Sequence, residues 1–428
     1  MAGSRWFRAG HGLILARQPW LSLHVPPGAN ALNILLIRLS AMGDVVRTLP
    51  ALMCIRRAYP QAHITWAVEE ASRDILADQA DLDEVLVFPR RKLSRLLLHP
   101  EELGDARRAL ATFTSALREA RFDLVLDFQG TLKSGLMARM TGAARRVGLG
   151  RGQAREMSHI FYTETAAMPR PQASKLNRVE RGLALVAHLG ASTEGAVSSL
   201  PERADDAAYV EGFLRTLAPA GGSAAAPAVI FPGTSRTQAY KRYPPGNFAR
   251  AADAIARQTG APIVVAWGPG EQGIASDVIG AMSSPAVLSP SLTLGQLTAL
   301  IRRARVFVAG DTGPMHIAWT VDTPLVAVYG PTDPEVNQPG GRFSEVAYQK
   351  VFCSPCRNRG CIARTCLEHL DPERVSSAAS SVMKRAEESG RTLWSYTPAA
   401  SAQVNPADPS APRFETMGPG MRPSGMDA

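Results

Sequence analysis

An aspartate that follows the first apolar run is the side chain best placed for chemistry. The run Ile34–Ile37 leads into Ser40–Asp44 (SAMGD), after which apolar residues return at helical spacing. A short continuous apolar run predicts a strand buried on both faces. Ligands of open parallel sheets bind beyond the carboxyl ends of the strands, so Asp44 lies where the chain can place an acid in a cleft. The alternative is that Asp44 only caps the helix that follows.

Two later turns have the composition of phosphate-binding loops. Pro232–Ser235 and Gly310–Pro314 each follow an apolar run and consist mainly of small residues. Backbone N–H groups at a helix start carry partial positive charge and bind phosphate readily. Lys241 could contact an anion held between the turns, and His316 could donate to one of its oxygens. The alternatives are Asp311 as a helix cap, His316 as a packed helix residue and Lys241 as a solvated surface residue.

The chain alternates strand and helix patterns in two blocks, which predicts an α/β fold with two Rossmann-like domains facing across a cleft. We expect a disordered or loosely docked extension at 1–30, a first domain at 31–200, a linker region at 201–227 and a second domain at 228–370. A C-terminal helix at 371–392 and a disordered tail at 393–428 follow. The helix often crosses back to the first domain in folds of this kind. The expected strands are 34–37, 63–68, 84–88, 123–127, 228–231, 262–266, 306–309 and 324–328.

Charge and composition favour an anionic partner. The chain of 428 residues has a formal net charge of +9, and its pI is near 9.6. Aromatic residues are few and do not alternate with basic ones, so we expect no nucleic acid partner. The chain has no apolar run of the ~20 residues that span a bilayer, and residues 1–30 do not form a typical signal peptide. Sparse cysteine favours a cytoplasmic setting.

Basic residues gather in the first block. They suit an anionic ligand or membrane surface, and the alternative is a merely solvated basic face. The residues are Arg56, Arg57, Arg90, Arg91, Lys92, Arg95, Lys133, Arg145 and Arg146.

Four of the five cysteines lie close together late in the chain. Cys353, Cys356, Cys361 and Cys366 have the spacing C-x2-C-x4-C-x4-C. A structural zinc site usually combines two short ligand spacings, which this pattern meets only in part. A zinc site, an iron–sulfur cluster, unligated thiols and a disulfide therefore all remain open.

Four segments together resemble glycosyltransferase family nine, the lipopolysaccharide heptosyltransferases, with the first half most similar to the heptosyltransferase I branch. They are Asn33–Pro50, Asp123–Ser134, Phe231–Tyr243 and Gly310–Thr332. The resemblance implies a GT-B fold. It also implies metal-independent, inverting transfer from ADP-L-glycero-D-manno-heptose to a Kdo residue of lipid A, or to the inner core, without a cofactor.

The resemblance also assigns roles to residues. Asp44 matches the general base of the family. The residues matched to the donor site are Thr234, Ser235, Lys241, Glu271, Leu292, Asp311, Thr312, Gly313 and His316. On the acceptor side we place Gly43, Gln129 and Lys133.

An acceptor made of Kdo and lipid A is strongly anionic, and so is the leaflet that holds it. We therefore expect peripheral contact with the inner face of the cytoplasmic membrane. Two alternatives remain: a sugar-nucleotide epimerase of GT-B shape, and a non-catalytic sugar-nucleotide or lipid-binding protein. A nicotinamide oxidoreductase is disfavoured because no G-x-G-x-x-G follows the first strand.

Overall fold

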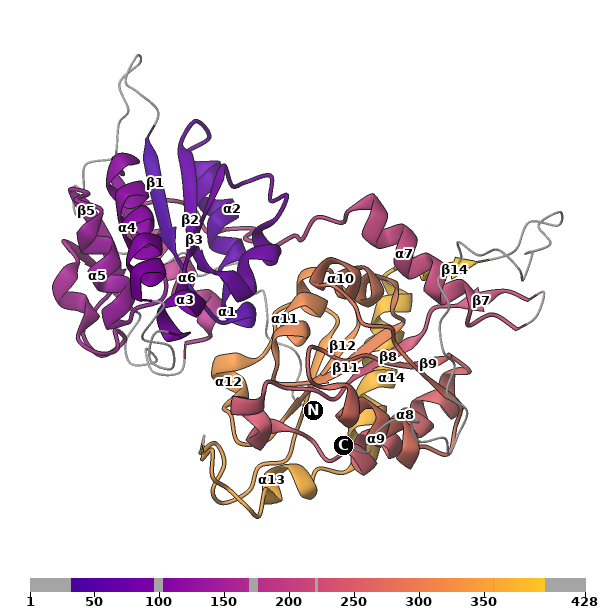
Figure 1. The fold of residues 1–428 in the computed structure, drawn as a ribbon. Helices are drawn as coiled ribbons and strands as arrows, with labels where there is room; N and C mark the ends of the chain where they lie inside the picture. Colours follow the sequence, from indigo (N-terminus) through magenta and orange to yellow (C-terminus); the bar gives the residue numbers. More distant parts are fainter. Residues whose placement is uncertain (1–31, 96–102, 169–175, 220–221, 357, 397–428) are drawn as a thin grey trace.

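The computed structural model describes residues 32–95, 103–168, 176–219, 222–356 and 358–396, which form two α/β domains (Figure 1). Each domain contains a six-stranded sheet in which every neighbouring pair of strands is parallel. The strand orders are β3-β2-β1-β4-β5-β6 and β10-β9-β8-β11-β12-β13. The two orders follow the same doubly wound pattern, so the predicted pair of Rossmann-like domains is confirmed.

The first domain begins at the central strand of its sheet. Its elements are β1 (Asn33–Ile37), α1 (Met42–Val46), α2 (Leu49–Ala58), β2 (His63–Glu69), η1 (Glu70–Leu76), β3 (Glu84–Phe88), α3 (Arg90–Arg95), α4 (Leu103–Glu119), β4 (Leu124–Asp127), α5 (Leu132–Met140), β5 (Arg145–Leu149), η3 (Ser158–Phe161), β6 (Glu164–Ala166) and α6 (Arg178–His188).

The second domain repeats the arrangement. Its elements are α7 (Ala204–Arg215), β7 (Ala224–Ala225), β8 (Ala228–Phe231), η4 (Arg236–Lys241), α8 (Pro245–Thr259), β9 (Ile263–Val265), α9 (Gln272–Ala281), β10 (Ala286–Leu288), α10 (Leu294–Arg303), β11 (Val306–Gly310), α11 (Gly313–Thr320), β12 (Leu325–Tyr329), α12 (Pro334–Asn337), β13 (Ser344–Tyr348), α13 (Thr365–Glu368), α14 (Pro372–Glu388) and β14 (Ser395–Tyr396).

Strand β1 shows why a continuous apolar run forms the centre of the sheet. Successive side chains of a strand point to opposite faces. Ile34 and Leu36 belong to one buried cluster, and Leu35 and Ile37 belong to another, all with no exposed surface. Because helices cover both faces, polar residues are excluded along the strand, and the first polar turn falls at its carboxyl end.

The structure also has strands that the sequence did not predict. They are β5, β6, β10 and β13, together with the short antiparallel pair β7–β14. Strand β5 begins with Arg145, whose guanidinium pairs with Glu164 of β6 at 2.7 Å. Charged residues of this kind interrupt the apolar pattern by which a strand is recognised.

The segment 201–227 was expected as a linker region with a helix at about 204–217, and this helix is confirmed as α7. It packs against α10 and so belongs to the second domain. Arg303 of α10 holds it by an ion pair to Glu211 at 2.8 Å. Helix α14 packs against α8 and against β11, β12 and β13, so the expectation that the C-terminal helix crosses back to the first domain is wrong. The predicted extension 1–30 and the predicted tail beyond Tyr396 lie outside the described residues. The start of that tail was wrongly predicted as disordered, because Ser395–Tyr396 forms β14, which pairs with β7.

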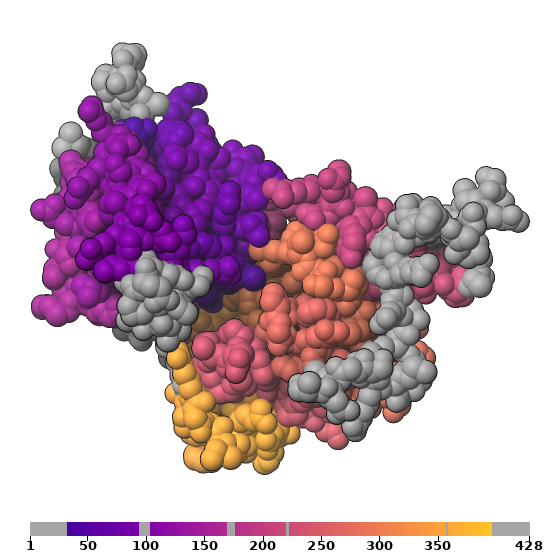
Figure 2. Space-filling model, in the orientation of Figure 1, coloured from indigo at the N-terminus to yellow at the C-terminus, as the bar shows by residue number. Residues whose placement is uncertain are grey.

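The two domains meet through α1 and α11, which begin at the carboxyl ends of β1 and β11 (Figure 1). One apolar cluster includes Val45 of α1 and both Met315 and Ile317 of α11, so the core of each domain continues into the contact. Figure 2 shows the first domain, in indigo and purple, seated directly on the orange part of the second. Within the described residues, no helix is long and apolar enough to cross a membrane.

We expect Leu36→Ala to destabilise the protein by about 2–5 kcal/mol, because a fully buried side chain of the central strand leaves a cavity. Urea denaturation followed by circular dichroism measures the change. Leu110→Ala on α4 is the matched control, since Leu110 is among the exposed apolar residues. Equal stability of the two variants would contradict the assignment of β1 to the core.

Candidate active site

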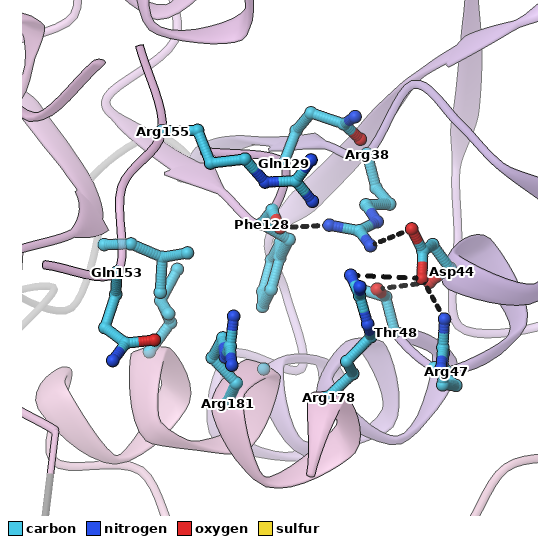
Figure 3. A pocket seen from close by; sticks show the side chains of 13 residues that line it. Arg38, Asp44, Arg47, Thr48, Phe128, Gln129, Gln153, Arg155, Arg178 and Arg181 are labelled. Carbon is cyan, nitrogen blue, oxygen red and sulfur yellow. Dashed lines mark hydrogen bonds and ion pairs between the residues drawn. The ribbon is translucent and has the colours of Figure 1, made fainter. Parts of the chain in front are cut away.

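Asp44 lies in the first turn of α1, and its carboxylate is surrounded by arginines rather than capping the helix (Figure 3). Arg38 Nη2 lies 2.7 Å from Oδ2, Arg47 donates to Oδ1, and Arg178 Nη1 lies 3.8 Å from Oδ1. Residue 41 is the N-cap of α1, and no side chain caps it. The interpretation of Asp44 as only a helix cap is therefore excluded.

The charge of the Asp44 carboxyl group is determined by the arginines around it. Burial by itself would raise the pKa of the Asp44 carboxyl, but the positive charges of Arg38, Arg47 and Arg178 outweigh it and hold that pKa far below its usual range. Burial lowers the pKa of Arg178 to about 10, which leaves it charged at neutral pH. The free protein therefore holds Asp44 as a tightly paired carboxylate.

Asp44 lines a small, partly open pocket of the first domain, with a cavity volume of about 30 Å³ (Figure 3). Five arginines line it, and Asp44 is the one acidic residue among its lining side chains. Such a pocket suits an acidic ligand, because arginine presents several donors to carboxylate or phosphate oxygens. The arginines are Arg38, Arg47, Arg155, Arg178 and Arg181.

The turn that carries Asp44 touches the start of α11 in the second domain. A Cβ atom at Gly43 would lie 2.6 Å from His316 Cδ2, and one at Gly313 would lie 2.7 Å from Met42 Sδ. A larger side chain at either glycine would force His316 or Met42 to shift. The sequence predicted two domains that face each other across a cleft; in the structure these two turns are in direct contact, and the pocket that Asp44 lines is formed by first-domain residues.

His316 lies between the charged groups of the two domains. His316 is buried, and burial is the main reason that its pKa is low. The positive charges of Arg47 and Lys241 lower the pKa further, and the charge of Asp44 raises it in part. Its imidazole is therefore neutral at neutral pH. Its Nδ1 is buried and has no hydrogen-bond partner among the described residues. A neutral ring in this place can exchange a hydrogen bond with a ligand oxygen.

Lys241 and Asp311 form the charged centre of the second domain's strand ends. Lys241 Nζ lies 2.7 Å from Asp311 Oδ2, and the Thr332 hydroxyl donates to the same oxygen at 2.8 Å. These residues follow β8, β11 and β12, which are neighbours in the sheet. Thr312, not Asp311, is the N-cap of α11, so the cap interpretation of Asp311 is excluded. Lys241 is mostly buried, which also excludes a solvated surface role.

The Pro232–Ser235 turn is braced by its own neighbours. Arg242 donates to the carbonyl oxygen of Thr234 at 2.6 Å and to its hydroxyl at 3.1 Å. That hydroxyl donates in turn to the carbonyl of Gln238. Thr234 therefore shapes the turn with its side chain already engaged, while the Ser235 side chain is exposed.

The other predicted donor residues lie around the same edge of the sheet. Glu271 accepts from the Gly268 amide at 3.3 Å and lies against the turn at Gly233; burial raises its pKa. Thr312 and Gly313 begin α11. Leu292 follows the edge strand β10 and packs against the main apolar cluster.

Of the three residues predicted on the acceptor side, one lines the pocket, one lies next to Asp44 and one does neither. Gln129 lines the arginine pocket, and Gly43 lies at the domain contact. Lys133 is not among the residues that line the pocket; its ammonium group lies 2.6 Å from the buried carboxylate of Glu69, which also binds Arg90. Arg56 and Arg145 likewise pair with acids, Asp83 and Glu164.

Sequence reasoning missed the arginine pocket. Arg38 and Arg47 flank Asp44 closely enough to have been noticed, because Arg47 is three residues away on the same helix face. Arg178 comes from α6 and reaches Asp44 only through the fold. It also donates to Asn337 Oδ1 of the second domain at 3.0 Å, and Tyr329 holds the Asn337 carbonyl at 2.7 Å.

The cysteines do not form a metal site in the part of the chain that the structure describes. Cys353 and Cys356 are exposed, Cys361 is half-buried and Cys366 is buried, and all four are free thiols. Burial, and then the neighbouring thiols, raise the pKa of Cys366 to about 11. No group of three or more histidine, cysteine or acidic side chains among the described residues is arranged to hold an ion.

The two Rossmann-like domains meet at their strand ends. One contributes a carboxylate, and the other contributes a turn with the composition of a phosphate-binding loop. This arrangement is that of a glycosyltransferase of the GT-B fold. The chain belongs to glycosyltransferase family 9 (heptosyltransferase), whose family model matches residues 110–367, more than half of the sequence.

Individual relatives agree with this assignment. Lipopolysaccharide heptosyltransferase 1 of Pseudomonas aeruginosa is 29% identical over 371 residues, which cover 82% of this chain and 98% of the relative. The Escherichia coli K12 protein of the same name is 29% identical over 71% of this chain and 89% of its own length.

Solved structures show the same fold. A family 9 glycosyltransferase from Veillonella parvula has a TM-score of 0.65 at 21% identity, covering 83% of this chain and 97% of its own. E. coli heptosyltransferase WaaC with ADP has a TM-score of 0.61 at 23% identity, covering 83% and 99%.

We expect Lys241→Ala to weaken ADP binding by about 10- to 100-fold and to lower turnover as well, because a charge-assisted hydrogen bond contributes about 1.5–3 kcal/mol. Calorimetry with ADP and steady-state kinetics measure the two effects. Arg257→Ala on the exposed side of α8 is the control. Unchanged ADP affinity in Lys241→Ala would transfer the role to Arg236 or Arg242.

Proposed function

We propose that the protein is an inverting heptosyltransferase that moves heptose from ADP-L-glycero-D-manno-heptose onto the Kdo, or inner-core, part of lipopolysaccharide. The observation that carries the proposal is the contact between the Asp44 turn and the start of α11, with His316 under the influence of both Asp44 and Lys241. Relatives named lipopolysaccharide heptosyltransferase 1 support the donor and acceptor classes.

Inverting transfer needs a base on one face of the anomeric carbon and a stabilised leaving group on the other. In this scheme Asp44 takes the proton of an acceptor hydroxyl. The oxygen of that hydroxyl bonds to the anomeric carbon at the same time. The bond from that carbon to the diphosphate oxygen breaks, and its electron pair leaves with ADP. The products are the heptosylated acceptor, ADP and one proton, which Asp44 later returns to solvent. General base catalysis of this kind contributes about 10²–10⁴ in rate.

The second domain would stabilise the ADP that leaves. Lys241 and the N-terminal amides of α11 provide positive charge beside Asp311, where the β11 turn begins. Preorganised charge of this type favours the transition state over the bound substrate. Because these groups supply the charge that a divalent cation would otherwise supply, we infer a metal-independent reaction without an organic cofactor.

The first domain would bind the acceptor. Its pocket presents five arginines beside Asp44, which suits the carboxylates and phosphates of a Kdo–lipid A acceptor. We assign the basic surplus of the chain to this acceptor and to an anionic leaflet, not to nucleic acid. Peripheral attachment to the inner face of the cytoplasmic membrane follows as part of the proposal.

Two other functions predict different behaviour. An epimerase would need a second acid or base opposite the reacting carbon, and it would convert ADP-heptose without an acceptor. A non-catalytic binding protein would bind ADP-heptose and release it unchanged. The paired Asp44 and the Lys241–Asp311 centre favour the transferase.

The test is incubation with ADP-heptose and Kdo-lipid A, with products measured by mass spectrometry. We expect the acceptor to gain one heptose and ADP to be released. Asp44→Asn should lower transfer about 10²–10⁴-fold while ADP affinity stays unchanged, because the carboxylate lies outside the donor turns. Thermal unfolding of this variant checks that the arginine cluster still folds. Turnover of Asp44→Asn at the original rate would remove Asp44 from the chemistry.

Binding to liposomes tests the membrane part of the proposal. We expect the protein to bind vesicles that contain anionic lipid and to leave them as salt is raised, because exposed charges separated by more than ~8 Å are largely screened at physiological ionic strength. Vesicles of neutral phosphatidylcholine are the control. Binding that is indifferent to salt and to lipid charge would argue against an electrostatic contact.

A further inference from the structure

The carboxylate proposed as the base is already engaged in the free protein. Both of its oxygens are in contact with guanidinium groups: Oδ2 with Arg38, and Oδ1 with Arg47 and, more distantly, Arg178. A carboxylate held by several cations is a poor proton acceptor, because the efficiency of a general base falls with its pKa. Asp44 as found here must therefore be released before it can serve an acceptor hydroxyl well.

The arginines that hold Asp44 have donors left over. Nε of Arg38, together with Nε and Nη1 of Arg47, is buried and has no hydrogen-bond partner among the described residues. Both side chains are about nine-tenths buried and line the pocket. Leaving a buried donor unpaired costs about 1–3 kcal/mol. An anion with several oxygens that reached these atoms would satisfy them and compete with Asp44 for the same guanidinium groups.

The pocket is small but has the charge to attract such an anion. Its cavity volume is about 30 Å³ and it is partly open, so an anion enters only as the arginines turn toward it; Figure 3 shows Arg155 and Arg181 extending toward the same space as Arg38. The charged and titratable groups that face Asp44 are Arg38 at the end of β1, Arg47 on α1, Arg178 on α6 and neutral His316 on α11. No acid of the pocket lining opposes an incoming anion other than Asp44 itself.

We propose that an anionic group of the acceptor, a carboxylate or a phosphate ester, takes over Arg38 and Arg47 and thereby frees Asp44 to act as the base. This inference rests on the proposed function and adds to it that the acceptor activates the enzyme that glycosylates it. Without acceptor, Asp44 stays paired and activates water poorly, so the donor is protected from hydrolysis. Arg38 and Arg47 are positioning residues in this scheme, and they select for an acidic acceptor.

The scheme separates binding from activation. If the arginines only bound the acceptor, neutralising its acidic groups would raise KM and leave kcat unchanged. If Arg38 and Arg47 also restrain Asp44, a neutralised acceptor could not displace them from the Asp44 carboxylate, and kcat would fall. A difference of one pKa unit corresponds to about tenfold in the protonation equilibrium, so we expect kcat to fall about tenfold or more.

The experiment compares three acceptors at saturating ADP-heptose: native Kdo-lipid A, the same molecule with its carboxylates converted to carboxamides, and the same molecule without its phosphates. We expect one of the two modified acceptors to show the fall in kcat, which identifies the group that displaces the arginines. With the native acceptor, the acidic fall in kcat should also lie at higher pH than with the modified one, because freeing Asp44 raises its pKa. An effect on KM alone for both modified acceptors overturns the inference.

The variant Arg47→Met tests the restraint directly, because a purely structural role of Arg47 would not predict an increase in rate. In Arg47→Met one restraining charge is gone, so we expect kcat on the modified acceptor to rise toward that on the native acceptor. Hydrolysis of ADP-heptose without acceptor should rise as well. Arg118→Met, on an exposed site of α4, is the matched control. A folded Arg47→Met that raises neither rate overturns the inference, and if this variant does not fold, the comparison of acceptors on the unmodified protein decides alone. No transfer to native Kdo-lipid A would instead refute the proposed function itself.

Discussion

The backbone contact between the Asp44 turn and the start of α11 is the constraint on which the rest of the structure depends. It exists because Gly43 and Gly313 carry no side chain at the point where the two helices approach. The contact places the strand ends of one sheet against those of the other, so Asp44 of one domain and His316 of the other lie close together. The apolar cluster that continues through Val45, Met315 and Ile317 gives this contact a hydrophobic foundation.

Charge around this contact is arranged in two centres, one with a positive surplus and one in which the charges are paired. In the first domain one carboxylate is surrounded by several guanidinium groups, which leaves a surplus of positive charge for an acidic ligand. In the second domain Lys241, Asp311 and Thr332 form a closely paired set whose cation is engaged until a ligand competes for it. His316 lies between the two centres and stays neutral because it is buried beside cations. A neutral residue there can bridge ligands without adding to the repulsion.

Arg178 connects the two domains through polar contacts. One of its nitrogens lies near Asp44, and another donates to Asn337 on α12, which Tyr329 fixes from the end of β12. A movement between the domains would therefore alter the charge environment of Asp44. Such coupling is a physical route by which domain closure and catalysis can be linked.

The sequence by itself determined the strands β1 to β4, β8, β9, β11 and β12 of the two parallel sheets and the turns that follow them, because these depend on local apolar runs and on small residues next to them. It also determined Asp44, Lys241 and Asp311 as chemically suited residues, since each follows a recognisable strand. Only the tertiary structure decided that α7 belongs to the second domain, that Lys133 pairs with Glu69, and that Arg38, Arg47 and Arg178 converge on Asp44. The reason is that ion pairs between distant elements leave no periodic trace in a sequence, so their partners become known only when the chain has brought them together.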